Sequence, residues 1–132
     1  LSAASDVYKR QTLALTILYE IDSIDRFASA QNFLSYCRLV KGTVASAGKI
    51  KGLRGAKLGN PYLRWAFGEA AVLGKRHHEA LDAYSRPREK THGKFKGNSI
   101  LASKLARAAY FRLKNGTSFD LEQLTGSSAK TT

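Results

Sequence analysis

Several features are scarce in this sequence of 132 residues, and each shortage excludes a class of protein. The single cysteine, Cys37, cannot form an intrachain disulfide or a cysteine-based zinc site, so a reducing, cytoplasmic location is the default expectation. No apolar run approaches the roughly 18 residues of a membrane span. The apolar stretch nearest the N-terminus, Leu13–Leu18, is too short for a signal peptide. Acidic residues are also few, 10 against 22 Lys and Arg.

The sequence contains enough apolar residues for one hydrophobic core and a large excess of positive charge. Hydrophobic residues make up 43% and aromatic residues 10%, which favours a folded chain over a disordered one. The length fits a single domain or a fragment of a larger protein. A formal charge of +12 and an isoelectric point near 10.1 indicate a nucleic acid or another anionic surface as partner.

The first eleven residues, LSAASDVYKRQ, are not typical of the rest of the protein. Residues 6–11 resemble the translated end of a sequencing adapter, so we interpret residues 1–11 as a non-native segment and expect part of the protein to precede it. The alternative is a natural polar lead-in to a helix. We expect a helical domain over residues 12–124 and a polar, flexible tail over residues 125–132.

The hydrophobic pattern predicts an all-α fold, a compact domain of about four to five helices. Ser29 is the expected N-cap of a second helix, and Asn60-Pro61 marks the start of a third. Pro87 is expected to close a short helix and to begin a basic loop over residues 86–97. Asn98 would then cap the last helix. The other expected helices cover residues 12–21, 30–37, 78–85 and 99–114.

Residues 41–59, the Gly/Lys segment, differ from the rest of the chain. Five glycines argue against a regular helix and predict a loop or a short hairpin. No Asp or Glu lies between Arg26 and Gly68. Cations beside glycines suit phosphate binding, because glycines let main-chain N–H groups approach the phosphate. The alternative is a solvated basic loop. The cations of this stretch are Arg26, Arg38, Lys41, Lys49, Lys51, Arg54, Lys57 and Arg64.

Other polar and aromatic residues give weaker signals. Ser46 lies within the Gly/Lys segment, where a serine among cations could attack a phosphodiester, although most loop serines are turn residues or solvated. The three histidines do not form a convincing metal set, and we predict no metal site. Trp65, Tyr62 and Phe67 are expected to pack mostly in the core, with base stacking as an alternative for Tyr62.

Three stretches, read in order, are similar to a known family. These are residues 33–40 (FLSYCRLV), residues 46–49 (SAGK), and residues 55–71 (GAKLGNPYLRWAFGEAA). Residues 99–111 look like the last helix of the same family. Together they resemble the C-terminal domain of insertion-sequence transposases of the DEDD-plus-serine kind, recombinases guided by a structured bridge RNA. The resemblance covers about residues 12–124, and the part from the serine to Gly59-Asn60-Pro61 is the specific one.

The resemblance implies roles that the residues alone do not. A serine of this domain becomes covalently joined to DNA, and by position that serine is Ser46, the only serine between Ser35 and Ser85. Lys49, Lys57, Asn60 and Arg64 match recurrent motif positions that would bind DNA or RNA phosphates. The family implies DNA as partner, a guide RNA, self-association of the full-length parent and no membrane. No cofactor is expected in this chain, and Mg²⁺ is expected in a separate RuvC-like domain with four acidic residues.

Two departures from the family pattern limit what the chain is expected to do alone. The Pro-Gly-x-Gly lead-in expected just before Leu13 is absent, and so is the acidic quartet. The prediction is therefore DNA transposition by the parent protein, with this fragment inactive by itself. The alternative is a non-catalytic basic module that binds DNA or RNA.

Overall fold

The computed structural model describes residues 2–40 and 59–116, which form five α-helices and one 3-10 turn, with no strand among them. The all-α fold predicted from the sequence is confirmed for these residues. No helix in this part of the chain is long and apolar enough to cross a membrane. The elements are α1 (Ser2–Ile21), η1 (Ile24–Arg26), α2 (Ala30–Tyr36), α4 (Pro61–His77), α5 (Glu79–His92) and α6 (Lys94–Asn115).

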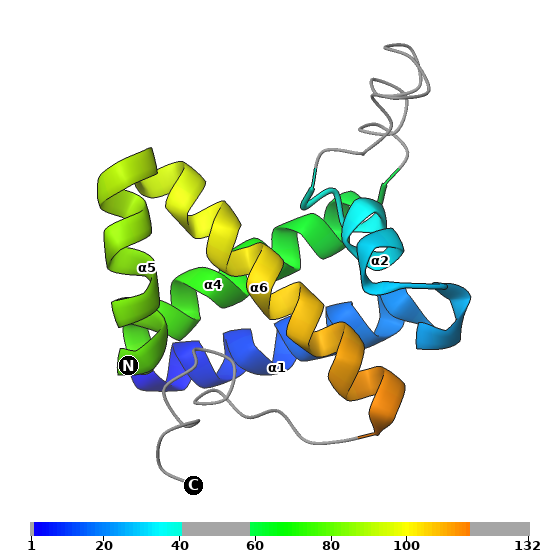
Figure 1. Ribbon diagram of the computed structural model, residues 1–132. Helices are drawn as coiled ribbons and strands as arrows, with labels where there is room; N and C mark the ends of the chain where they lie inside the picture. The colour runs from blue at the N-terminus through cyan, green and yellow to red at the C-terminus, as the bar shows by residue number, and fades with distance from the viewer. Residues whose placement is uncertain (1, 41–58, 117–132) are drawn as a thin grey trace, which may run out of the picture.

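Helix α4 is the central element of the described fold. It packs against α1 on one side and against α5 and α6 on another, while α2 packs against α6 (Figure 1). The chain turns from α4 into α5 at the single residue His78, and α6 then packs against both α5 and α4. Residues 2–11 form the first half of α1. The interpretation of residues 1–11 as a non-native segment stays a prediction.

The core lies where α2, α4 and α6 meet. Phe33 of α2 has no exposed surface, and its ring contacts Phe67 of α4 and Tyr110 of α6 at centroid distances of 6.1 and 5.9 Å. Small side chains on the inner faces of α4 and α6, such as Ala71 and Ala106, let the helices approach closely. Burial of these side chains is the main source of stability, because apolar surface leaves water.

Two predicted helix caps are confirmed. The Ser29 hydroxyl accepts a hydrogen bond from the main-chain N–H of Asn32 at 3.2 Å, at the start of α2. The Asn60 side chain caps α4, and Pro61 follows at the first helical position, where its missing N–H costs nothing. The expected stop after Asn115 is confirmed as well, because Gly116 adopts the left-handed conformation with φ 69°.

The prediction that Pro87 closes a short helix is wrong, because α5 continues through Pro87 to His92. Pro87 has no main-chain N–H to donate to the carbonyl of Ala83. Both residues are exposed, so water can donate a hydrogen bond to that carbonyl instead. The rest of α5 is held by packing against α4 and α6. The Arg88 guanidinium also donates to the Tyr84 carbonyl at 2.6 Å and lies 3.6 Å from the centre of the Tyr84 ring.

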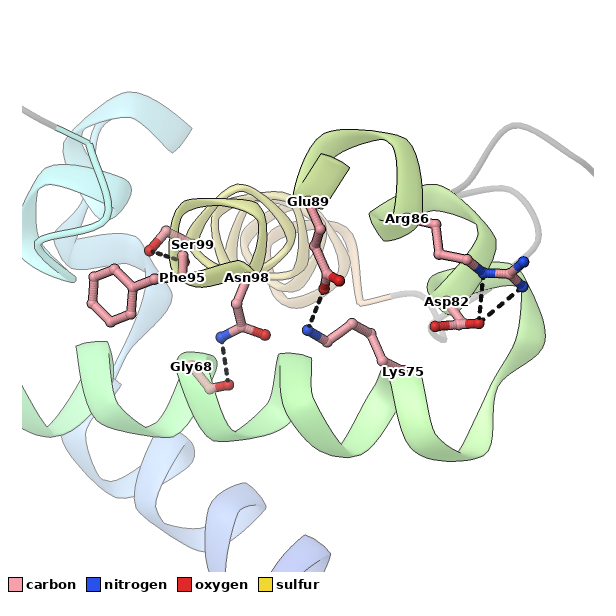
Figure 2. A network of polar contacts seen from close by, with 8 residues as sticks. All are labelled: Gly68, Lys75, Asp82, Arg86, Glu89, Phe95, Asn98 and Ser99. Carbon is pink, nitrogen blue, oxygen red and sulfur yellow. Dashed lines mark hydrogen bonds and ion pairs between the residues drawn. The ribbon is translucent and has the colours of Figure 1, made fainter. Parts of the chain in front are cut away.

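The predicted basic loop over residues 86–97 and the cap at Asn98 are also wrong. Between residues 86 and 97 the helical conformation is interrupted only at Gly93, and α6 begins at Lys94. The φ of Gly93 is 94°, a value that residues with side chains rarely adopt. Asn98 lies one turn inside α6, and its side-chain amide donates to the carbonyl of Gly68 in α4 at 3.3 Å (Figure 2). Next to it, Lys75 of α4 and Glu89 of α5 form a half-buried ion pair at 2.8 Å.

Candidate nucleic-acid interface

The two ends of the Gly/Lys segment meet at one place, which we call the stem and define as residues 36–40 and 59–60. The main-chain N–H of Asn60 donates to the carbonyl of Tyr36 at 2.6 Å. Gly59 lies so close to the other side of the stem that an added Cβ would be 2.6 Å from that same carbonyl oxygen. Residues 41–58, which leave from and return to the stem, lie outside the described residues.

Asn60 is the residue that connects the stem to three helices. Its side-chain oxygen accepts hydrogen bonds from the main-chain N–H groups of Tyr62 and Leu63, at 2.8 and 3.0 Å. Its side-chain nitrogen donates to the Glu20 carboxylate at 2.7 Å and to the Tyr36 hydroxyl at 3.3 Å. The residue is only 8% exposed. These contacts use the full hydrogen-bonding capacity of the amide, so Asn60 has a structural role, and its contact with nucleic acid stays a prediction.

Tyr36 and Arg26 extend this polar cluster toward α1. The Arg26 guanidinium donates to the Ile21 carbonyl at 2.7 Å and to the Tyr36 hydroxyl at 3.4 Å, and it lies 5.1 Å from the centre of the Tyr36 ring. Hydrogen bonds from Asn60 and Arg26 lower the pKa of the Tyr36 hydroxyl, because both favour the phenolate. Sequence reasoning missed Tyr36, since nothing in its local pattern signals a partner 24 residues away.

Within the stem, the main chain of Arg38 adopts a conformation that is unusual for an arginine. Its φ is 59°, in the left-handed region that glycine normally occupies at the end of a helix. The turn satisfies the last carbonyls of α2, since Arg38 and Leu39 donate to Ser35 and Leu34 at 3.0 Å each. Two side chains then fix the outgoing chain: Ser103 of α6 donates to the Leu39 carbonyl at 2.9 Å, and Arg64 of α4 donates to the Arg38 carbonyl at 3.4 Å.

The N-terminus of α4 offers no free main-chain donor to a phosphate. Pro61 has no N–H, and the next two N–H groups are bound to the Asn60 side chain. The N–H of Arg64 donates to the Asn60 carbonyl at 3.2 Å. Anion binding here would therefore depend on side chains, above all on the exposed guanidinium of Arg64.

Two of the three aromatic residues of α4 face solvent. Phe67 is 3% exposed, as predicted, but Trp65 is 51% and Tyr62 63% exposed, so the prediction that they pack mostly in the core is wrong. The reason is helical register, because Leu63, Ala66 and Phe67 take the inner face and leave positions 62 and 65 outside. Beside Trp65 is an open groove of about 300 Å³ between α4 and α6, lined by Pro61, Arg64, Trp65, Gly68, Glu69, Val72 and Asn98.

The other predicted site residues divide between the described and the undescribed parts of the chain. Arg64 and Asn60 lie at the stem and at the start of α4. Within residues 2–40 and 59–116, no three His, Cys, Asp or Glu side chains group closely enough to hold a metal ion. Cys37 is fully buried, and desolvation raises the pKa of its thiol to about 12. The predictions outside the described residues are catalytic Ser46 and the binding residues Lys41, Lys49, Lys51, Arg54 and Lys57.

Comparison with known proteins gives one match. Residues 10–86 match the family model described as Transposase IS116/IS110/IS902 family. No curated protein matches the chain, and no solved structure does. The matched residues include the second half of α1, then α2, the stem, the Gly/Lys segment, α4 and the first half of α5. Because the match covers more than half of the 132 residues, the chain belongs to the IS116/IS110/IS902 family of transposases.

Proposed function

We propose that this chain acts in DNA transposition as the serine-bearing, nucleic-acid-binding C-terminal domain of its transposase. The family match carries this proposal, because it includes the Gly/Lys segment with Ser46. The geometry of the stem supports it. Hydrogen bonds from α1, α4 and α6 fix both ends of the segment, so a nucleophile within it is attached to a rigid base.

In the proposed reaction, the Ser46 hydroxyl oxygen attacks the phosphorus of a DNA phosphodiester. A bond forms between that oxygen and phosphorus, and the bond from phosphorus to one deoxyribose oxygen breaks. The serine loses a proton and the leaving deoxyribose oxygen gains one, so the exchange is balanced. The reverse attack by a different DNA end restores a phosphodiester and releases the serine. Lys49 and Lys57 would stabilise the negative charge that develops on the phosphoryl oxygens.

The remaining requirements of this reaction are assigned to the parent transposase. A RuvC-like domain would hold Mg²⁺, which would polarise the phosphoryl group. The guide RNA and self-association of the parent belong to the same proposal. The 132-residue chain alone is accordingly expected to perform no magnesium-dependent strand transfer.

Nucleic-acid binding can be tested on the chain by itself. The affinity for a labelled DNA duplex is measured by fluorescence anisotropy as a function of salt, with Arg64→Gln and the double variant Lys49→Gln/Lys57→Gln compared with the unaltered chain. Each lost phosphate contact is expected to reduce the slope of log affinity against log salt by about one. Lys9→Gln serves as a matched control, because it removes an exposed cation far from the stem in sequence. Equal slopes in all variants would contradict the proposed interface.

The covalent step needs the parent protein with its acidic quartet. Cleavage reactions with labelled DNA are stopped by denaturation, and protein–DNA adducts are separated by gel electrophoresis. Ser46→Ala is expected to abolish the adduct, while Ser35→Ala keeps it. If the adduct still forms with Ser46→Ala, Ser46 is not the nucleophile. The function of this domain would then be that of a non-catalytic basic binding module.

A further inference from the structure

We infer that the groove between α4 and α6 binds an unpaired nucleobase, stacked on the ring of Trp65; this rests on the proposed nucleic-acid binding. The groove lies next to the stem, since Arg64 lines it and also donates to the Arg38 carbonyl. A strand whose phosphates are held at the stem would therefore pass its bases along the groove. Trp65 is half exposed, so a large aromatic side chain is accessible to solvent there.

Three large apolar side chains of α4 are exposed to solvent. Tyr62, Trp65 and Val72 are 63%, 51% and 39% exposed. Their spacing of three and seven residues places them on one side of the helix. An aromatic face beside cations suits single-stranded nucleic acid, because bases stack on rings while the backbone follows the positive charge.

The floor of the groove has room for a flat ring. A Cβ added at Gly68 would meet no atom within 4 Å, so open space lies above the main chain there. The floor is also fixed, because the Asn98 amide donates to the Gly68 carbonyl and ties α6 to α4 (Figure 2). Phe95, 81% exposed, lies one turn before Asn98 on the same face of α6, above α4 in this view.

The charges of the groove favour a base inside it and a phosphate at its edge. Glu69 lines the groove, and a carboxylate repels phosphate but accepts hydrogen bonds from the N–H groups of an unpaired base, such as the N3–H of thymine. Arg64, at the end nearest the stem, supplies the cation for the backbone. A base that is paired and stacked within a duplex cannot enter such a groove, so the ligand is single-stranded or locally unpaired nucleic acid.

Trp65 is the only tryptophan of the chain, so intrinsic fluorescence reports this site directly. The 132-residue chain is titrated with single-stranded oligothymidine, with the same length of DNA duplex, and with inorganic polyphosphate as an anion without bases. Saturable quenching by oligothymidine, and much weaker quenching by the duplex and by polyphosphate, is expected. Equal quenching by polyphosphate, or binding of oligothymidine without quenching, would overturn the proposal.

Variants give an independent readout, in which anisotropy of a labelled oligothymidine is followed at about 0.2 M salt to weaken phosphate contacts. Trp65→Leu is expected to weaken binding roughly tenfold, the effect of losing one base–ring stack, and to leave duplex binding unchanged. Tyr19→Leu is the matched control, since Tyr19 is an 81% exposed ring on α1 outside the groove. Far-UV circular dichroism checks that both variants keep their helices.

The two proposals fail in different ways. If the unaltered chain binds neither oligothymidine nor duplex at any salt concentration, the proposed nucleic-acid binding fails, and the base site fails with it. If the chain binds both but Trp65→Leu and Tyr19→Leu have the same affinity for oligothymidine, only the base site is refuted.

Discussion

Asn60 closes the stem by donating its main-chain N–H to the carbonyl of Tyr36 at 2.6 Å and its side-chain amide to the hydroxyl of the same residue at 3.3 Å. The first bond joins the two chain ends that flank residues 41–58. The second ties them to a tyrosine that also contacts Arg26. The side-chain amide of this one buried residue thus caps α4 and binds the Glu20 carboxylate of α1, while its main-chain N–H closes the stem. Removing it affects three helices at once.

Asn60→Ala is expected to lower the free energy of unfolding by about 2–4 kcal/mol, through loss of a helix cap and of two part-buried side-chain hydrogen bonds. Urea denaturation followed by circular dichroism measures the change. Ser29→Ala is the matched control, because Ser29 caps α2 with one exposed hydrogen bond and should cost only about 0.5–1 kcal/mol. Similar costs for the two variants would show that the side-chain hydrogen bonds of Asn60 to Glu20 and Tyr36 contribute nothing.

Two glycines within helices are expected to respond oppositely to alanine. At Gly97 the new Cβ would lie 2.9 Å from the Cα of Glu89, where α5 and α6 touch, and main-chain atoms cannot move aside cheaply. Gly97→Ala should therefore destabilise the fold by about 1–3 kcal/mol. At Gly68 the Cβ meets nothing, so Gly68→Ala should stabilise α4 by about 0.5–1 kcal/mol. Thermal unfolding of both variants tests the prediction, and a fall in melting temperature for Gly68→Ala would contradict it.

Pro87→Ala is expected to stabilise the fold, because it restores a main-chain donor to the carbonyl of Ala83 inside α5. The gain should be about 1–3 kcal/mol, less than the full proline penalty because the surrounding helix has adapted to the ring. Urea denaturation measures it. Glu79→Pro is the control and should change stability little, because Glu79 is the first residue of the same helix, where proline is tolerated, and His78 before it is already extended.

The behaviour of α5 shows what the sequence could and could not predict. Proline and a run of basic residues are local signals, and they argue for a loop over residues 86–97. The helix exists because of contacts with α4 and α6, such as the Lys75–Glu89 ion pair, that local pattern does not encode. By contrast, the caps at Ser29 and Asn60 are local chemistry, and both were predictable from residue type and position.

The same distinction applies to the candidate site. Charge distribution and glycine content identified the Gly/Lys segment, and the family resemblance identified Arg64 as a candidate phosphate-binding cation. The exposure of Trp65 depends on which residues of α4 take the inner face, and a helix with apolar residues on several faces leaves that choice open. The partners of Asn60 come from residues 24 and 40 positions away, so sequence spacing could not reveal them.

The two ion pairs drawn in Figure 2 should differ in strength. Lys75 and Glu89 are only 14% and 22% exposed, and removing either leaves a charge in a half-buried place. Lys75→Ala should therefore cost about 1–3 kcal/mol. Arg86 and Asp82 are 65% and 41% exposed, so Arg86→Ala should cost less than about 0.5 kcal/mol. Urea denaturation at low and high salt measures the loss of stability in both variants. A larger loss for Arg86→Ala than for Lys75→Ala would contradict the prediction that the Lys75–Glu89 pair is the stronger one.

Cys37 should make the stability of the fold decrease at high pH. Burial raises the pKa of its thiol from 9.0 to about 12, so between these values the folded chain keeps a proton that the unfolded chain has released. Because the unfolded state then binds fewer protons, the free energy of unfolding falls as pH rises, by up to about 1.4 kcal/mol per pH unit from this group. Cys37→Ala removes that contribution, although it lowers stability at neutral pH by leaving a small cavity.

The comparison between the unaltered chain and Cys37→Ala isolates the thiol, since every other titrating group is common to both. Urea denaturation at a series of pH values above 9.0 should show a steeper decline for the unaltered chain. The buried thiol is also expected to react with a thiol reagent only when the chain opens, because the thiolate is the reactive form. Its rate of modification should then follow the stability of each variant, fastest in Asn60→Ala. Rapid modification of the folded chain, or parallel pH curves for the two proteins, would mean that Cys37 is accessible to water.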